Sequence, residues 1–194
     1  MHTLIDRLAR IFAQIGGGVL AVLIVLTCLS VLGRSLNGIL HSDWVEAVAP
    51  NLANWLLGLG IGPINGDFEL VEAGMAFAIF AFLPICQLHG AHAKVDIFTS
   101  ALPARFNRWL IAVIDLVFAL VLLLIAAQLF QGMESKRSSG QTTFLLEFPI
   151  WWAYGLSLLG AIVAAGVAVY VALMRIAEIA LGRAILPASL EGEA

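Results

Sequence analysis

Long apolar stretches, separated by a few charged residues, run through most of this chain. A helix that crosses a bilayer needs about 20 mainly apolar residues, and four stretches reach that length. They cover residues 11–33, 70–88, 109–132 and 149–174. The pattern predicts an all-α integral membrane protein in which residues 1–194 form a single four-helix membrane domain.

A further uncharged stretch between the first two spans holds two prolines, three asparagines and four glycines, which makes it unsuited to the bilayer core. Residues 44–59, which overlap it, place apolar side chains at helical spacing. Leu52 and Leu56 lie on this apolar face, with Trp44 and Trp55 towards its two ends. We expect a short amphipathic helix that lies flat at the membrane interface, facing a partner or the membrane.

The composition supports a membrane protein, because 61% of the residues are apolar and 12% are charged, whereas soluble domains carry about a quarter charged residues. The mean hydropathy is +1.00. With a net charge of −3, the chain has no basic excess to neutralise phosphates, so nucleic acid is not an expected partner. Two cysteines are too few for a disulfide framework or a four-thiolate zinc site.

The distribution of lysine and arginine predicts the orientation, because these residues accumulate in cytoplasmic loops. Seven of the ten lie at the N-terminus, in the second loop or in the C-terminal tail, and the others are Arg34, Lys136 and Arg137. Both termini are therefore predicted to be cytoplasmic. The five tryptophans lie at predicted span ends or in the 44–59 segment, which indicates an aromatic belt.

Asp115 is the clearest ionisable residue inside a predicted span, about two helical turns beyond Arg108. Such residues are functional candidates, but an ion path needs several polar groups in series. Two interpretations stay open. Asp115 takes part in transport chemistry, or it pairs with Arg108, Lys94, Arg105 or a partner helix.

Arg34 ends the first span, and Glu69 and Glu72 open the second span on the same side of the membrane. Acidic residues are favoured at a helix N-terminus, so helix capping would explain the two glutamates. An ion pair from Arg34 to Glu69 or Glu72 would also tie the first two helices together where an unpaired charge is costly.

His89 and His92 form an H-x-x-H pair, a spacing that could place two metal ligands on one helical face. Two histidines do not complete a metal site, because zinc sites use three or four protein ligands. We therefore expect a polar role at the helix end and no metal. The sequence has no G-x-S-x-G motif, so we expect no catalytic residue. No histidine lies inside a predicted span, where a haem would need its axial ligands, so we expect no cofactor.

Several short motifs follow one another along the four spans. They are Val31-Leu-Gly-Arg34, Glu69-Leu-Val-Glu72, His92-Ala-Lys-Val-Asp96-Ile97 with Leu102-Pro103, and Pro149-Ile-Trp151. In this order they resemble the small, DctQ-type permease subunit of tripartite ATP-independent periplasmic (TRAP) transporters. The segment 36–66 is longer than the common pattern of that family.

The resemblance implies a bacterial inner-membrane subunit that binds a much larger permease subunit and is served by a periplasmic substrate-binding protein. In that family the large subunit carries the sodium-coupled transport path, and the small subunit braces its stationary part. The substrates are usually organic anions such as dicarboxylates, other carboxylic acids, sialic acids or sulfonates. The motif residues Arg34, Glu69, Glu72, His92 and Asp96 are then candidates for structural or partner contacts.

A stand-alone four-helix carrier or membrane enzyme, with Asp115 or Glu72 as its ionisable group, is the alternative. The first and fourth predicted spans contain no charged residue, so the sequence offers no visible translocation path. A supporting subunit is therefore the preferred interpretation.

Overall fold

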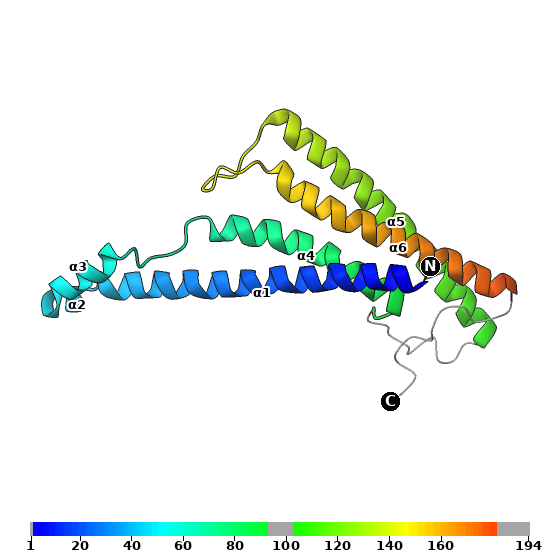
Figure 1. Cartoon of the computed structure of the whole chain (residues 1–194), viewed down its shortest axis with the longest axis horizontal. Coiled ribbons are helices and arrows are strands. Elements are labelled where there is room, and N and C mark those ends of the chain that lie inside the picture. The colour runs from blue at the N-terminus through cyan, green and yellow to red at the C-terminus, as the bar shows by residue number, and fades with distance from the viewer. Residues whose placement is uncertain (1, 93–102, 182–194) are drawn as a thin grey trace.

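The structure, a computed structural model, describes residues 2–92 and 103–181. Within these ranges it contains six helices (Figure 1), namely α1 (His2–Leu40), α2 (Asp43–Val48), α3 (Pro50–Gly58), α4 (Asp67–His89), α5 (Ala104–Ser139) and α6 (Trp151–Leu181). Four of them, α1, α4, α5 and α6, are long and apolar enough to cross a membrane. The predicted all-α architecture with four membrane spans is confirmed.

The long helices extend beyond the apolar stretches that predicted them, and α1 shows this most clearly. It continues past Arg34 to Leu40, although its apolar stretch ends at residue 33. Its 39 residues make a rod of roughly 58 Å at about 1.5 Å per residue, nearly twice the ~30 Å hydrocarbon core. Polar residues can leave the lipid without interrupting backbone hydrogen bonds, so hydropathy locates the membrane and not the helix end.

The segment predicted as one interfacial helix, residues 44–59, forms two short helices instead. α2 and α3 meet at Ala49, whose backbone leaves the helical region (φ −145°, ψ 57°). Pro50 is the cause, because proline has no N–H donor and its ring disfavours a helical conformation in the preceding residue. We call α2, α3 and residues 34–40 of α1 the arm. It lies beyond the start of α4 (Figure 1).

α1 packs against α4 along a narrow stripe. The buried residues of α1 are spaced seven apart, namely Ala9, Gly16, Leu23 and Ser30. This is the repeat of left-handed helix pairs. Glycine allows the close approach, because a Cβ on Gly16 would lie 2.9 Å from the Cβ of Ala81, and one on Gly74 would lie 2.8 Å from Leu23.

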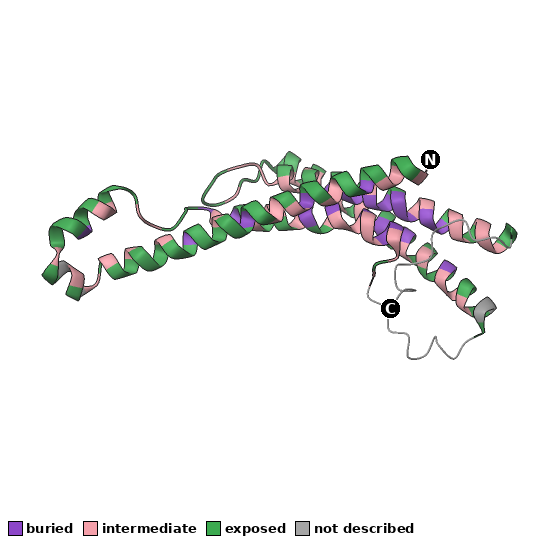
Figure 2. Cartoon of the chain, turned by 60° about the horizontal axis from the view of Figure 1, so that its bottom comes forward, coloured by how far each residue is buried: buried purple, intermediate pink, exposed green. Residues whose placement is uncertain are grey.

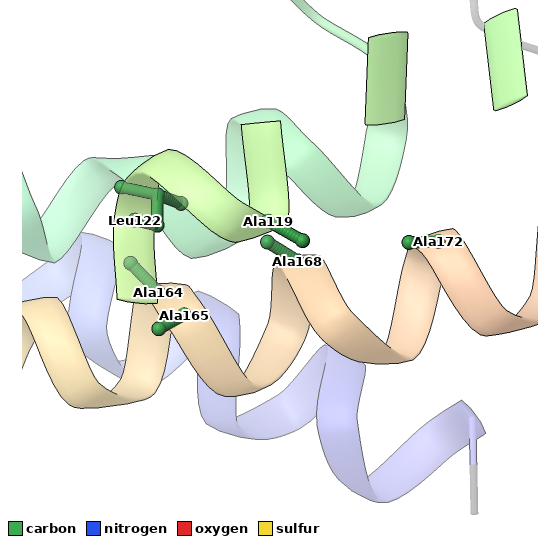
Figure 3. Packing of buried hydrophobic residues seen from close by; sticks show 6 residues of the cluster. All are labelled: Ala119, Leu122, Ala164, Ala165, Ala168 and Ala172. Carbon is green, nitrogen blue, oxygen red and sulfur yellow. The ribbon is translucent and has the colours of Figure 1, made fainter. Parts of the chain in front are cut away.

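α6 is the central helix, and small residues line its packed sides. Its contact with α5 is a buried cluster (Figure 3) formed by Ala164, Ala165, Ala168 and Ala172 with Ala119 and Leu122. On the side of α4, Gly160 lies against Phe80, where a Cβ at Gly160 would come within 2.9 Å of the Phe80 Cβ. Small residues let membrane helices approach closely enough for van der Waals packing to hold them.

The four long helices form an open array. α1 packs on α4, α4 on α6 and α6 on α5, whereas α1 and α5 share no extensive contact over the described ranges. Large apolar side chains on these two helices stay exposed, Val22 and Leu124 among them. Burial is concentrated where the long helices meet, and the arm is mostly exposed (Figure 2). The array therefore presents broad apolar faces to lipid or to a partner.

The helices alternate in direction, so α1 begins and α6 ends at one end of the molecule, which we call the terminal end (Figure 1). At the opposite end, α1 ends, α4 begins, and residues 140–150 connect α5 to α6. Residues 140–150 form a hairpin with an antiparallel bridge between Thr142 and Pro149. We call this the hairpin end.

Candidate functional site

The hairpin is held to α4 by Glu69, a carboxylate in the first turn of that helix. Glu69 is buried, with 9% of the residue exposed. Its Oε1 accepts a hydrogen bond from the Leu145 N–H at 2.6 Å, and its Oε2 accepts one from the Leu146 N–H at 2.9 Å. Because hydrogen bonds to an ionised acceptor are strong, this one side chain fixes the tip of the hairpin on the start of α4.

Two residues with left-handed backbones shape the same junction. Gly66 precedes α4 with φ 78°, and the Leu146 side chain occupies the space that a Cβ there would need. Glu147 has φ 54°, a conformation that costs roughly 1–2 kcal/mol for a residue with a Cβ. The bonds from Glu69 to the two preceding residues keep the chain in this turn.

A cavity of about 310 Å³ lies among the hairpin, α4, α5 and α6. α4 and α6 touch at Phe80 and Gly160, and the hairpin bridges them towards the hairpin end. The walls combine aromatic rings with carboxylates and include Glu69, Glu72, Phe80, Leu129, Phe148 and Tyr154. We call this space the hairpin cavity.

The structure corrects the predicted partner of Arg34. Its guanidinium lies 3.9 Å from the carboxylate of Asp67, and not against Glu69 or Glu72. Residues 67 and 69 are about 200° apart around a helix of 3.6 residues per turn, so Asp67 faces Arg34 while Glu69 faces the hairpin. Glu72, about one turn beyond Glu69, is exposed and lines the hairpin cavity.

The chain between α3 and α4 runs back along α1 and is held by polar groups of that helix. The Asn37 Nδ2 donates to the Ile61 carbonyl at 3.1 Å, and the Ile64 N–H donates to the Ser30 Oγ at 3.2 Å. Ser30 is fully buried. These bonds satisfy backbone groups outside regular secondary structure and position the start of α4 beside α1.

At the terminal end, Asp115 connects α5 to α4 and α6. Its carboxylate accepts a hydrogen bond from Gln87 Nε2 of α4 at 3.2 Å and lies 3.6 Å from Arg175 Nε of α6. Gln87 is 3% exposed, and its Oε1 accepts a hydrogen bond from His92 Nε2 at 2.9 Å. The network gives Asp115 contacts with α4 and α6, through two residues that were not among the predicted partners Arg108, Lys94 and Arg105.

Gln87 and Arg175 are site residues that the sequence pattern does not single out. Gln87 could have been noticed as an amide side chain inside an otherwise apolar predicted span. Arg175 directly follows the fourth predicted span, and nothing else in the sequence marks it. Asp96 and Lys94, by contrast, are sequence candidates that lie outside the described residues. The same holds for the side chain of Arg105.

The two histidines of the H-x-x-H pair contact different partners. The Nε2 of His89 lies 3.0 Å from Asp6 Oδ1 of α1, whereas His92 donates to Gln87. They therefore act as separate contacts at the end of α4, one to α1 and the other to the Asp115 network.

Of the four apolar residues named for the predicted interfacial helix, three are exposed in the arm. Trp44 is 74% exposed, Leu52 is 57% exposed and Trp55 is 62% exposed, whereas Leu56 is partly buried. Ala53, at 2% exposure, marks the side on which α3 is packed. The aromatic and aliphatic groups on the other side are available to lipid or to a partner.

Comparison with known families matches residues 61–180 to the family described as "Tripartite ATP-independent periplasmic transporters, DctQ component". The matched segment contains the hairpin cavity and the residues Gln87, Asp115 and Arg175, and it leaves α1 and the arm outside. Comparisons with curated proteins and with solved structures give no match.

Proposed function

Since the chain belongs to the DctQ component family of tripartite ATP-independent periplasmic transporters, we propose that it braces the large permease subunit of such a transporter in a bacterial inner membrane. The complex would receive its substrate from a periplasmic binding protein. It would couple uptake of an organic anion to sodium, as the resemblance implies for the family.

The open array is the observation that supports a bracing role. α1 and α5 expose apolar side chains along their lengths, and α6, at the centre, is held by small residues on the sides that face its neighbours. An array with such exposed sides offers a large apolar surface to another membrane protein, and close packing at small residues holds its helices together.

The contacts of Asp115 support bracing over a stand-alone carrier or membrane enzyme. Its carboxylate bonds to Gln87 and lies beside Arg175, so it links three helices of the array. A carboxylate engaged in this way is suited to holding helices together in a medium where an unpaired charge is costly.

Reconstitution into proteoliposomes tests the proposal. This chain, the large permease subunit and the binding protein would be combined in all pairs and together, with a panel of dicarboxylates, sialic acids and sulfonates. We expect uptake only with all three, driven by a sodium gradient and not by potassium. Uptake by this chain alone would establish a carrier, and full uptake without it would remove the bracing role.

For the orientation, we propose cytoplasmic termini, on the strength of the lysine and arginine distribution. A reporter fused after Ser139, in the last turn of α5, should report the periplasm, and one at the C-terminus should report the cytoplasm. The reverse pattern would invert the topology.

A further inference from the structure

The hairpin cavity contains an acidic group whose counter-charge is missing from the described part of the chain. Glu72 lines the cavity, in the second turn of a helix that crosses the membrane. No described lysine, arginine or histidine lies within 4.0 Å of its carboxylate. Ionisable groups at such positions are costly unless they are paired.

The described cations at the hairpin end are engaged elsewhere. Arg34 lies beside Asp67, Lys136 donates to Gln141 at 2.7 Å, and Arg137 lies over the Trp151 ring at 5.9 Å from its centroid. Glu69, the other carboxylate of the cavity, is committed to the hairpin backbone. None of these described groups is therefore placed to act as the counter-ion of Glu72.

The walls of the cavity suit a cation that is carried on an apolar stem. Phe80, Phe148 and Tyr154 supply aromatic surface, and the Tyr154 ring is packed against Gly132, where a Cβ would come within 2.7 Å of it. Cations are attracted to aromatic faces as well as to carboxylates, and long basic side chains bury their methylene stems along apolar surface. At about 310 Å³, the space is at the lower limit of small-molecule pockets.

We propose that the hairpin cavity receives an arginine or lysine side chain from a membrane helix of the large permease subunit, with Glu72 as its counter-ion. This inference rests on the proposed function, because it names the large subunit as the source. Two observations favour that source. Every lining residue lies inside the family-matched segment 61–180, as expected for a site that meets the partner shared by the family. Both α4 and α5 line the cavity, yet they share no extensive contact with each other over the described ranges, so the space between them can admit a side chain.

The test begins with recovery of the complex. The tagged chain would be co-expressed with the large subunit and purified in mild detergent, as wild type and as Glu72→Gln and Glu72→Lys. The large subunit would bury Glu72, which is exposed in this chain alone. Breaking a charge pair that is buried in a complex is costly, so we expect about tenfold less large subunit with Glu72→Gln and still less with Glu72→Lys. The matched control is Glu134→Gln, an exposed glutamate on α5 that does not line the cavity, which should behave as wild type.

A second measurement identifies the occupant. A photo-crosslinking amino acid at Phe148, which lines the cavity, should capture a large-subunit peptide that contains arginine or lysine, and the same group at the exposed Phe68 serves as the control. Glutamate at the captured basic residue should then restore the complex of Glu72→Lys. Undiminished recovery with both Glu72 variants, a captured peptide without a basic residue, or capture of an ammonium-headed lipid would each overturn the proposal. Failure of the wild-type chain to recover the large subunit would instead contradict the proposed function.

Discussion

The hairpin and the arm lie at the same end of the molecule and both connect long helices, yet they are built in opposite ways. The hairpin is fixed by the buried Glu69, which accepts two of its backbone hydrogen bonds. The arm leaves Trp44 and Trp55 exposed, with Ala53 as its packed residue. The hairpin also lies inside the family-matched segment, and the arm lies outside it. One connection is thus stabilised within the chain, whereas the other carries apolar surface that only lipid or a partner can bury.

The largest effect is expected at the hairpin. Glu69→Leu removes the acceptor of two backbone N–H groups at a buried position, so the free energy of unfolding should fall by about 3 kcal/mol. Equilibrium unfolding in detergent measures it. Glu72→Leu, one turn further along α4 at an exposed position, is the matched control and should change the stability by less than about 0.5 kcal/mol. Equal effects of the two changes would show that the hairpin is not held by Glu69.

The arm should show the opposite behaviour. Leu52→Asp with Trp55→Asp alters two exposed side chains, so the chain's own stability should change little. Its binding to the large subunit should weaken by about 2 kcal/mol, as for aromatic residues at an interface centre. Co-purification measures this, with Ala53→Asp as the variant that should instead destabilise the arm itself. Normal recovery of the complex with impaired uptake would indicate that the arm contacts the binding protein. Normal recovery and normal uptake would indicate that the arm contacts only lipid.

A smaller gain in stability is expected at the turn of the hairpin. Glu147 has a positive φ, so Glu147→Gly should raise the free energy of unfolding by about 1 kcal/mol, because glycine adopts this conformation without a Cβ penalty. Glu147→Ala keeps the Cβ and should give no such gain. A loss of stability with glycine would mean that the Glu147 side chain stabilises the turn by more than the backbone strain costs.

The smallest effect is expected at the base of the arm, at the ion pair of Arg34 with Asp67. The Arg34 side chain is 68% exposed and the distance is 3.9 Å, so a double-mutant cycle of Arg34→Leu and Asp67→Asn should give a coupling below about 1 kcal/mol. The cycle of Arg34→Leu with Glu69→Leu should be additive. Coupling in the second cycle and not in the first would restore the partner that the sequence predicted.

The extent of sequence-based prediction differs between elements for identifiable reasons. The four spans follow from hydropathy, because lipid tolerates only long apolar helices there. The break at Ala49 could have been expected from Pro50, whose effect on the preceding residue is local. The partner of Arg34 could not have been predicted in this way. Asp67 and Glu69 both lie at the start of α4, and only the rotation of that helix against α1 selects between them.

The sequence by itself determined that this chain crosses the membrane four times and which family it resembles, since these depend on local composition and spacing. The tertiary structure decided which buried carboxylate holds the hairpin, which helices Asp115 joins through Gln87 and Arg175, and that α4, α5, α6 and the hairpin line a cavity beside Glu72. Those outcomes depend on the rotation and separation of helices distant in the chain. Close contacts such as Gly160 against Phe80 set that geometry, and no local pattern encodes it.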